Sequence, residues 1–255
     1  MDQDAELFVY CVLSAADVDE PQGHPAKDLE GVDRQPVSFV LCGDLAAAVS
    51  VVDPDRPPSR RADLLAYQSV LDVLARTCPV APVRFGTVLP DVDQVVDEVL
   101  APGGDELRGL LERLRGREQF NLRAVHVQDR VLADVVAGNR EIRELRELTM
   151  DVPEDASYRE RVRLGELVSR AIEERSTRDA DLLMDAVVPF AVAHKVRTFP
   201  SATQVLDVAL LVDRARSEEF VATLEGLAEA VHETIQMTLL GPLAPYDFVG
   251  EASWD

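Results

Sequence analysis

The residues best suited to chemistry in this chain are its histidines and cysteines, and they are too scattered to form a recognised site. None of them shows the C-x-x-C or H-x-x-x-H spacing that places two metal ligands side by side. The G-x-S-x-G, Walker and G-x-G-x-x-G motifs of acyl transfer and nucleotide binding are missing as well. We therefore predict no catalytic residue, no cofactor and no metal site. One chance metal site stays open, because His126 and His194 fall in segments expected to be neighbouring strands.

Arg84 is the residue whose setting most suggests a specific contact. It lies in the apolar run 83–89, which reads as a buried strand. A guanidinium is permanently charged, so it must find a partner or lie at an edge. Two interpretations stay open. Arg84 either presents its fork of donors to the backbone or a carboxylate of a partner, or pairs with a buried carboxylate and orients the hairpin.

The tail 241–255 also carries residues of a recognition type. Tyr246 and Phe248 are too apolar for a purely solvated segment, while Pro242 and Pro245 keep the chain extended and lower its ordering cost. We predict that 241–249 packs back onto the body, across the groove between two domains. With Arg84, Tyr246 and Phe248 are the candidate partner-binding residues.

Composition narrows the class of protein. The 255 residues are 47% hydrophobic, enough for a sizeable core in one large or two modest domains. A net charge of −21 repels nucleic-acid phosphate and anionic membranes, so neither is an expected partner. The acidic start MDQDAEL is unlike a signal peptide, and no run reaches the roughly 18 apolar residues of a membrane helix. The three cysteines are an odd number and no two of them are close in sequence, so a disulfide framework is not expected. This indicates a reducing compartment and a soluble cytoplasmic protein.

The first part of the chain predicts a sheet followed by helices. Leu7, Val9, Cys11 and Leu13 alternate as on one face of a half-buried strand, and Gly43-Asp44 marks the turn of a hairpin. Asp91 begins a helix, with Gln94 placed as in a capping box. The expected elements are strands at 6–13, 37–42, 46–52 and 83–89, a polar loop at 16–36, and helices from 62, from 91 and at 105–114.

Beyond Gly116 the expected order is β, α, β, β, α, β, which is the ferredoxin-like order with its first crossover enlarged by extra helices. Asn139 is expected to break the first of these helices. The long helix after Pro153 is expected to turn Tyr158 and Val162 inward. We predict an α+β protein with two domains and a tail. Residues 1–116 form an N-terminal α+β domain, residues 117–240 form a modified ferredoxin-like domain, and residues 241–255 form the tail. The remaining expected elements are strands at 119–127, 188–196, 205–212 and 235–239, and a helix at 214–232.

The chain resembles the gas vesicle protein family GvpL/GvpF. The resemblance rests on five segments in collinear order, and each of them alone is mostly core pattern. Phe120-Asn121-Leu122-Arg123 departs from the aromatic-Gly-Val-Lys run often found in the family, and the insert 17–35 has no counterpart in the pattern. The segments are ADLLAYQSVLDVLARTCPVAPVRFGTVLPD, QFNLRAVHV, RVRLGELVSRAIEER, VLDVALLVDRARSEEF and LLGPLAPYDFV.

The resemblance implies a cytoplasmic, gas-vesicle-associated assembly or minor structural protein that is not an enzyme. Its partners would be the major shell protein and other gas vesicle proteins. A small, very apolar shell subunit suits an acidic partner that offers strand edges or shields an apolar face. The alternative is a ligand-sensing regulatory module, which rests on the ferredoxin-like order alone. A third hypothesis, an unrecognised enzyme, has no grouped nucleophile and base to support it.

Overall fold

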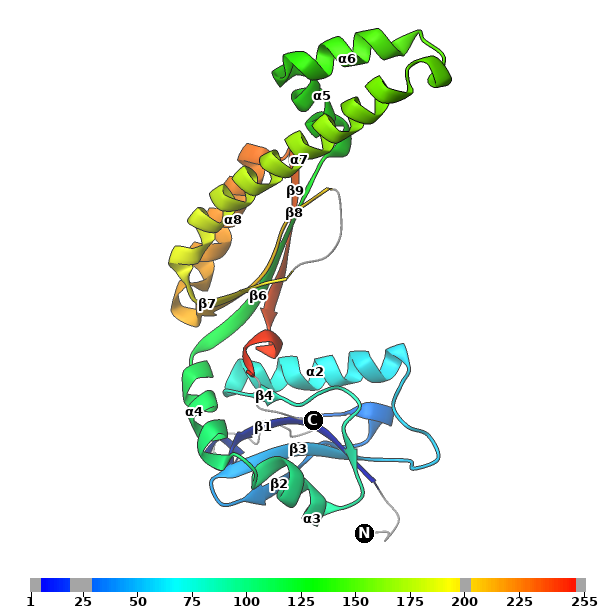
Figure 1. Ribbon diagram of the computed structural model, residues 1–255. Coiled ribbons are helices and arrows are strands. Elements are labelled where there is room, and N and C mark those ends of the chain that lie inside the picture. The colour runs from blue at the N-terminus through cyan, green and yellow to red at the C-terminus, as the bar shows by residue number, and fades with distance from the viewer. Residues whose placement is uncertain (1–5, 19–28, 198–202, 251–255) are drawn as a thin grey trace. The chain divides into compact units, whose positions relative to one another are not determined.

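The computed structural model describes residues 6–18, 29–197 and 203–250. The chain forms two compact units. Unit 1 comprises Met1–Gln119 together with Gly241–Asp255, and unit 2 comprises Phe120–Leu240. Both units combine helices with a β-sheet, so the predicted mixture of helix and sheet is confirmed (Figure 1).

The sheet of unit 1 has the strand order β2-β3-β1-β4. The fifth strand, β5, also pairs with β1, at Leu7 and Phe8, whereas β4 pairs with it at Cys11 and Val12. The predicted hairpin is present. Ser38 pairs with Val49 and Cys42 with Leu45 across a turn in which Gly43 has a φ of +61°. The strands are β1 (Glu6–Ser14), β2 (Ser38–Cys42), β3 (Leu45–Val52), β4 (Ala81–Pro82) and β5 (Val88–Leu89).

The prediction of a half-buried first strand is wrong, because β1 is covered on both faces. Its pairing with β3 shifts register between Val9 and Cys11, so a bulge interrupts the alternation there. As a result Cys11 joins the same buried cluster as Phe8 and Tyr10, not the face of Val9. All seven residues 7–13 are buried.

Helices cover both faces of this sheet. α2 (Arg61–Thr77) lies on one face, and its Tyr67, Leu71 and Leu74 share a buried cluster with β1 (Figure 1). α4 (Gly104–Leu114) contacts β1 and β4, with its leucines at 107, 110, 111 and 114 buried as their spacing predicts. α3 (Val92–Gln94) begins at Asp91, whose carboxylate accepts a 2.8 Å hydrogen bond from the Gln94 backbone N–H, and runs into a π-helical segment, η2 (Val95–Leu100).

Two further segments of unit 1 differ from expectation. The predicted strand 83–89 is instead a turn that follows β4 and leads into β5, which covers only Val88–Leu89. Part of the predicted loop 16–36 is ordered, as a short helix α1 (Ala15–Val18) and a 3-10 turn η1 (Val32–Arg34). The backbone N–H of Val32 donates to the Tyr10 hydroxyl at 2.7 Å. A Cβ at Gly31 would lie 2.0 Å from that hydroxyl oxygen, so the close approach requires glycine. Residues 19–28 of the insert lie outside the described residues.

The sheet of unit 2 has the order β7-β8-β6-β9. Counted from the first strand of each unit, both sheets therefore have the order 2-3-1-4. α7 and α8 pack on the sheet of unit 2 through a cluster that contains Phe120, Leu183, Leu210 and Phe220. The strands are β6 (Arg117–His126), β7 (Ala191–Val196), β8 (Gln204–Asp213) and β9 (Ile235–Leu243), and α8 is Ser217–Val231.

The first crossover of unit 2 is a three-helix bundle. α5 (Gln128–Gly138), α6 (Arg140–Met150) and the long α7 (Tyr158–Val187) contact one another. Asn139 breaks the first helix as predicted and caps the second by accepting from the Ile142 backbone N–H. The inward placement of Tyr158 and Val162 is wrong, since both are exposed. The inner stripe of α7 begins at Leu164 and Leu167, because only there do α5 and α6 cover the helix.

Candidate partner-binding site

Arg84 lies in an exposed turn and not in a buried strand. Two hydrogen bonds close the turn: the Thr87 backbone N–H and the Thr87 hydroxyl both donate to the Arg84 carbonyl, at 3.2 and 2.8 Å. Gly86 has a φ of +90°, which favours glycine and ends the strand. Apolar flanks predicted a continuous strand here, but the positive φ overrides them. Since the side chain is exposed, the buried ion-pair interpretation of Arg84 is wrong.

The neighbour of Arg84 anchors this turn in an aromatic cluster. The Phe85 ring lies 5.8 Å from Phe8 and 5.4 Å from Tyr67, both edge-on. Tyr67 donates a short hydrogen bond from its hydroxyl to the Val83 carbonyl. Tyr10 stacks on Tyr67 with a centroid distance of 6.1 Å. These contacts hold the backbone on both sides of Arg84, so the guanidinium projects from a fixed base.

The tail of unit 1 docks against the same cluster. The Tyr246 ring lies 6.2 Å from Tyr67, so Tyr67 contacts both the tail and the turn beside Arg84. Ala244 is fully buried, and its backbone N–H donates to the Asp72 carboxylate of α2. Burial raises the pKa of Asp72, and Arg76 and the Ala244 hydrogen bond offset part of that rise. The tail is thus held by apolar and polar contacts together.

A reciprocal pair fixes the next residue of the tail. The Gln119 side-chain amide donates to the Asp247 carboxylate at 2.6 Å, and its carbonyl oxygen accepts from the Asp247 backbone N–H at 3.0 Å. Gln119 is fully buried. A buried amide with both ends satisfied specifies one arrangement of its neighbours.

Tyr246 and Phe248 are not freely exposed, because both side chains are half-buried. The Tyr246 hydroxyl is buried and finds no hydrogen-bond partner among the described residues. Burial first, and then the neighbouring Tyr67, Asp72 and Cys11, raise the pKa of Tyr246. Tyr246 therefore acts as an anchor of the tail, and Arg84 is the candidate whose functional group reaches solvent.

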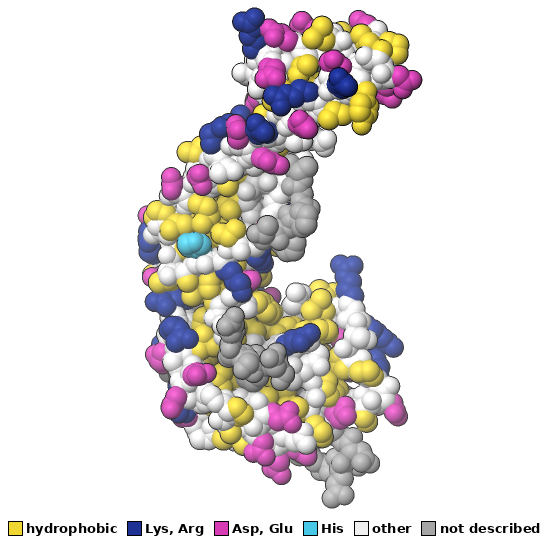
Figure 2. Space-filling model, viewed as in Figure 1, with side chains coloured by type: hydrophobic (Ala, Val, Ile, Leu, Met, Phe, Trp, Pro, Cys, Tyr) yellow, Lys and Arg dark blue, Asp and Glu magenta, His cyan; other side chains and the backbone are white. Residues whose placement is uncertain are grey.

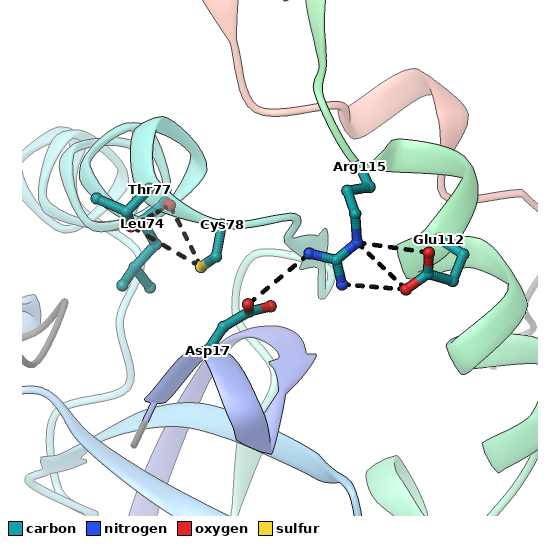
Figure 3. A network of polar contacts seen from close by, with 6 residues as sticks. All are labelled: Asp17, Leu74, Thr77, Cys78, Glu112 and Arg115. Carbon is teal, nitrogen blue, oxygen red and sulfur yellow. Dashed lines mark hydrogen bonds and ion pairs between the residues drawn. The ribbon is translucent and has the colours of Figure 1, made fainter. Parts of the chain in front are cut away.

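A second polar network ties the end of α4 to the insert (Figure 3). The Arg115 guanidinium contacts Glu112 at 3.0 Å and Asp17 at 3.8 Å. The Cys78 thiol beside it donates to the Leu74 carbonyl at 3.5 Å. All three cysteines are free, and burial raises the pKa of the Cys11 thiol. Because Arg115 contacts Asp17 of α1 and Glu112 of α4, this network is suited to holding α1 against α4.

Unit 2 contains a Ser-His-Asp cluster that the sequence did not reveal, in which His126 and Asp179 are buried. His126 Nε2 lies 2.9 Å from Asp179 Oδ2, and Ser176 Oγ lies 3.5 Å from His126 Nδ1. Arg175 donates to the same carboxylate oxygen at 2.8 Å. Ser176 and Asp179 are one turn apart inside α7, where the backbone N–H groups are used by the helix and cannot form an oxyanion hole. The cluster joins the end of β6 to α7, which is a structural role.

The proposed meeting of His126 and His194 does not occur. His194 is exposed on β7, where it pairs with Leu210, and His126 is buried against Asp179. Among residues 6–18, 29–197 and 203–250, no group of three histidine, cysteine, aspartate or glutamate side chains is arranged to hold a metal ion. Within these ranges no helix has the length and apolar character needed to cross a membrane.

Comparison with known proteins identifies the family. The model of the family described as gas vesicle synthesis protein GvpL/GvpF matches residues 6–250. The chain belongs to this family. Gas vesicle protein F of a Streptomyces species is 37% identical over 219 residues, with 84% of this chain and 88% of the relative covered. Gas vesicle protein L of the same organism is 30% identical over 284 residues, with 100% and 97% covered.

Solved structures agree with this fold. The crystal structure of gas vesicle protein GvpF from Anabaena superposes with a TM-score of 0.83 at 19% identity, covering 96% of this chain and 98% of that one. GvpF from Microcystis aeruginosa gives a TM-score of 0.78 at 18% identity, with the same coverage. Membership of GvpL/GvpF gives this protein a role connected with gas vesicles.

Proposed function

We propose that this protein is a non-catalytic assembly or minor structural protein of gas vesicles that works in the cytoplasm and binds the major shell protein. The observation that carries the proposal is the family match from residue 6 to residue 250. A net charge of −21 supports it, because a strongly charged partner keeps an apolar, aggregation-prone subunit in solution.

Arg84 is the proposed point of contact in unit 1. Its guanidinium is exposed, while Phe85 and Tyr67 fix the backbone beneath it. A guanidinium offers five donors in a planar fork, which suits backbone carbonyls or a carboxylate of a shell subunit. Tyr246 contributes by holding the tail against Tyr67, so that the surface around the turn keeps one shape. Phe248 is half-buried in the same tail.

An edge strand of unit 2 offers a second means of contact. Among the described residues β7 pairs with β8 alone, and five of its six residues are exposed, among them Val192 and Val196. An unpaired edge presents backbone donors and acceptors to which another strand can be added. We propose this edge as the place where a β-strand of the shell subunit pairs.

Two variants separate these contacts in a pull-down of the full-length protein with the shell subunit. Arg84→Ala should weaken capture, whereas the matched control Arg61→Ala, another exposed arginine of unit 1, should not. Val192→Lys with Val196→Lys places charge along the edge of β7. If neither variant lowers capture of the shell protein, both contact assignments are wrong even though the family role stands.

We also propose that residues 117–240 form a modified ferredoxin-like domain, beside an N-terminal domain 1–116 and the docked tail 241–255. The order β7-β8-β6-β9, with α7 and α8 on the sheet, supports this assignment. Native-state hydrogen exchange should then show two sets of core amides, those of β1 and those of β8, opening with different free energies. A single shared opening free energy at every denaturant concentration would contradict separate domains.

A further inference from the structure

The end of the three-helix bundle carries an unusual concentration of exposed apolar side chains. We define the helical tip as residues 148–162, which comprise the last residues of α6, the connection to α7 and the first residues of α7. Leu148 is 63% exposed, Met150 66% and Tyr158 69%, and Val152 and Val162 are also exposed. Figure 2 shows hydrophobic side chains interleaved with acidic and basic ones over this end of unit 2. Tyr158 and Val162 are four residues apart, on one face of α7.

These side chains are not required by the core of the bundle. The buried cluster of the three helices contains Val131, Val135, Ile142 and Leu167, and none of the five exposed tip residues belongs to it. Large apolar groups left in water contribute nothing to folding. A local concentration of them on a soluble domain marks an interaction site.

The tip is also held in a fixed conformation. Arg161 donates to the carbonyls of Thr149 and Val152 at 2.8 and 3.2 Å, and to the Ser157 hydroxyl at 3.0 Å. Ser157 in turn donates to the Pro153 carbonyl at 3.0 Å and is buried. One arginine therefore closes the connection between the helices. A preorganised surface loses little entropy on binding, which favours recognition.

The charges around the tip define the partner. Asp151, Glu154, Asp155 and Glu160 are exposed. Two basic residues lie among them, Arg159, which is exposed, and Arg161, which donates to backbone carbonyls. Four acidic residues against two basic ones leave the rim of the apolar surface with a net negative charge. A second copy of this chain would bring the same acidic rim and a net charge of −21 against it, which is repulsive.

We propose that the helical tip is a docking site for a partner protein that presents an apolar face flanked by lysine or arginine. Met150 and Tyr158 are the central contacts, because a flexible thioether and an aromatic ring adapt to an apolar partner surface. This site is distinct from Arg84 and from β7, and it does not depend on shell-protein binding.

A pair of synthetic helical peptides tests this proposal on the full-length protein. One peptide has a leucine face flanked by lysines, and its twin has glutamates in place of the lysines. The lysine peptide should bind the wild-type protein at least about tenfold more tightly than the glutamate peptide. Met150→Ser with Tyr158→Ser should weaken that binding about tenfold, and the effect should persist at raised salt, where general attraction is screened.

Leu182→Ser with Leu240→Ser is the matched control, since these side chains are 66% and 57% exposed and lie off the tip. The control should bind the lysine peptide like the wild type. Equal binding by all three proteins would mean that the net charge alone attracts the peptide, and the proposal would be overturned. No binding by the wild type would overturn it too. Sedimentation that shows a wild-type dimer lost in the tip variant would identify a second copy as the occupant, against the proposal.

Discussion

Two tyrosine-to-phenylalanine changes in unit 1 should have different effects on stability. Each change removes one hydroxyl and keeps the ring. The Tyr67 hydroxyl donates to the Val83 carbonyl, whereas the Tyr246 hydroxyl is buried without a partner among the described residues. A buried hydrogen bond contributes about 1 kcal/mol net, and leaving its carbonyl unpaired adds to the loss, so Tyr67→Phe should destabilise by about 1–2 kcal/mol.

Tyr246→Phe should be neutral or stabilising. An unpartnered buried hydroxyl costs about 1–3 kcal/mol. Because Tyr246 is only half-buried, we expect the gain to lie at or below the lower end of that range, at about 0–1 kcal/mol. The two variants should therefore differ by about 2 kcal/mol in the stability of unit 1, which corresponds to several degrees in Tm.

Hydrogen exchange of the β1 amides in the two variants measures this difference, because these amides belong to the core of unit 1. Tyr246→Leu serves as a control that removes the aromatic contact with Tyr67 and should destabilise. If Tyr246→Phe costs as much as Tyr67→Phe, the Tyr246 hydroxyl has a partner and its assignment as an unpartnered buried group is wrong.

Three further predictions follow from buried polar groups and the tail. Burial raises the pKa of Asp72 above 3.8, so ionising this carboxyl costs stability in the folded state. Asp72→Asn should therefore be more stable than the wild type at pH 7. Thermal melts should show this advantage vanishing below about pH 3.8, where the carboxyl is protonated in both the folded and the unfolded protein. An advantage that persists unchanged at lower pH would contradict the assignment. Truncation after Leu240 should lower the unfolding midpoint and weaken shell-protein capture together; loss of neither would show that the tail is dispensable. Asp179→Ala leaves His126 and Arg175 without their shared acceptor and should cost about 2–3 kcal/mol in urea unfolding, and a cost near zero would rule out the structural role of that cluster.

Periodicity predicted much of the fold, and it failed where local backbone geometry overrides alternation. The leucine spacing of α4 and the Gly43-Asp44 turn each admit one structure. The bulge at Val9 and Cys11 carries no residue signal, so the face assignment of β1 failed. The turn at Gly86 lies among apolar residues that equally suit a strand. The order 2-3-1-4 of unit 1 was not predicted, because the described part of its first crossover contains a four-residue α-helix and a 3-10 turn, which carry little periodic signal.

The candidate site was less predictable than the fold, because its parts come from distant segments. Arg84 and Tyr246 were singled out by type, but Tyr67, which contacts Tyr246 and the turn, reads as an ordinary core residue of a helix. Gln119 and Asp247 are 128 residues apart, and neither lies in a motif. A single sequence gives no signal for such pairs, since only the folded chain brings them together.

The proposal that this protein binds the major shell protein is tested most directly by co-purification. The full-length protein, coexpressed with the shell subunit, should capture it and keep it in solution, and a strain that lacks this protein should form no vesicles until the gene is restored. Absence of capture, together with normal vesicles in the deletion strain, would contradict the account.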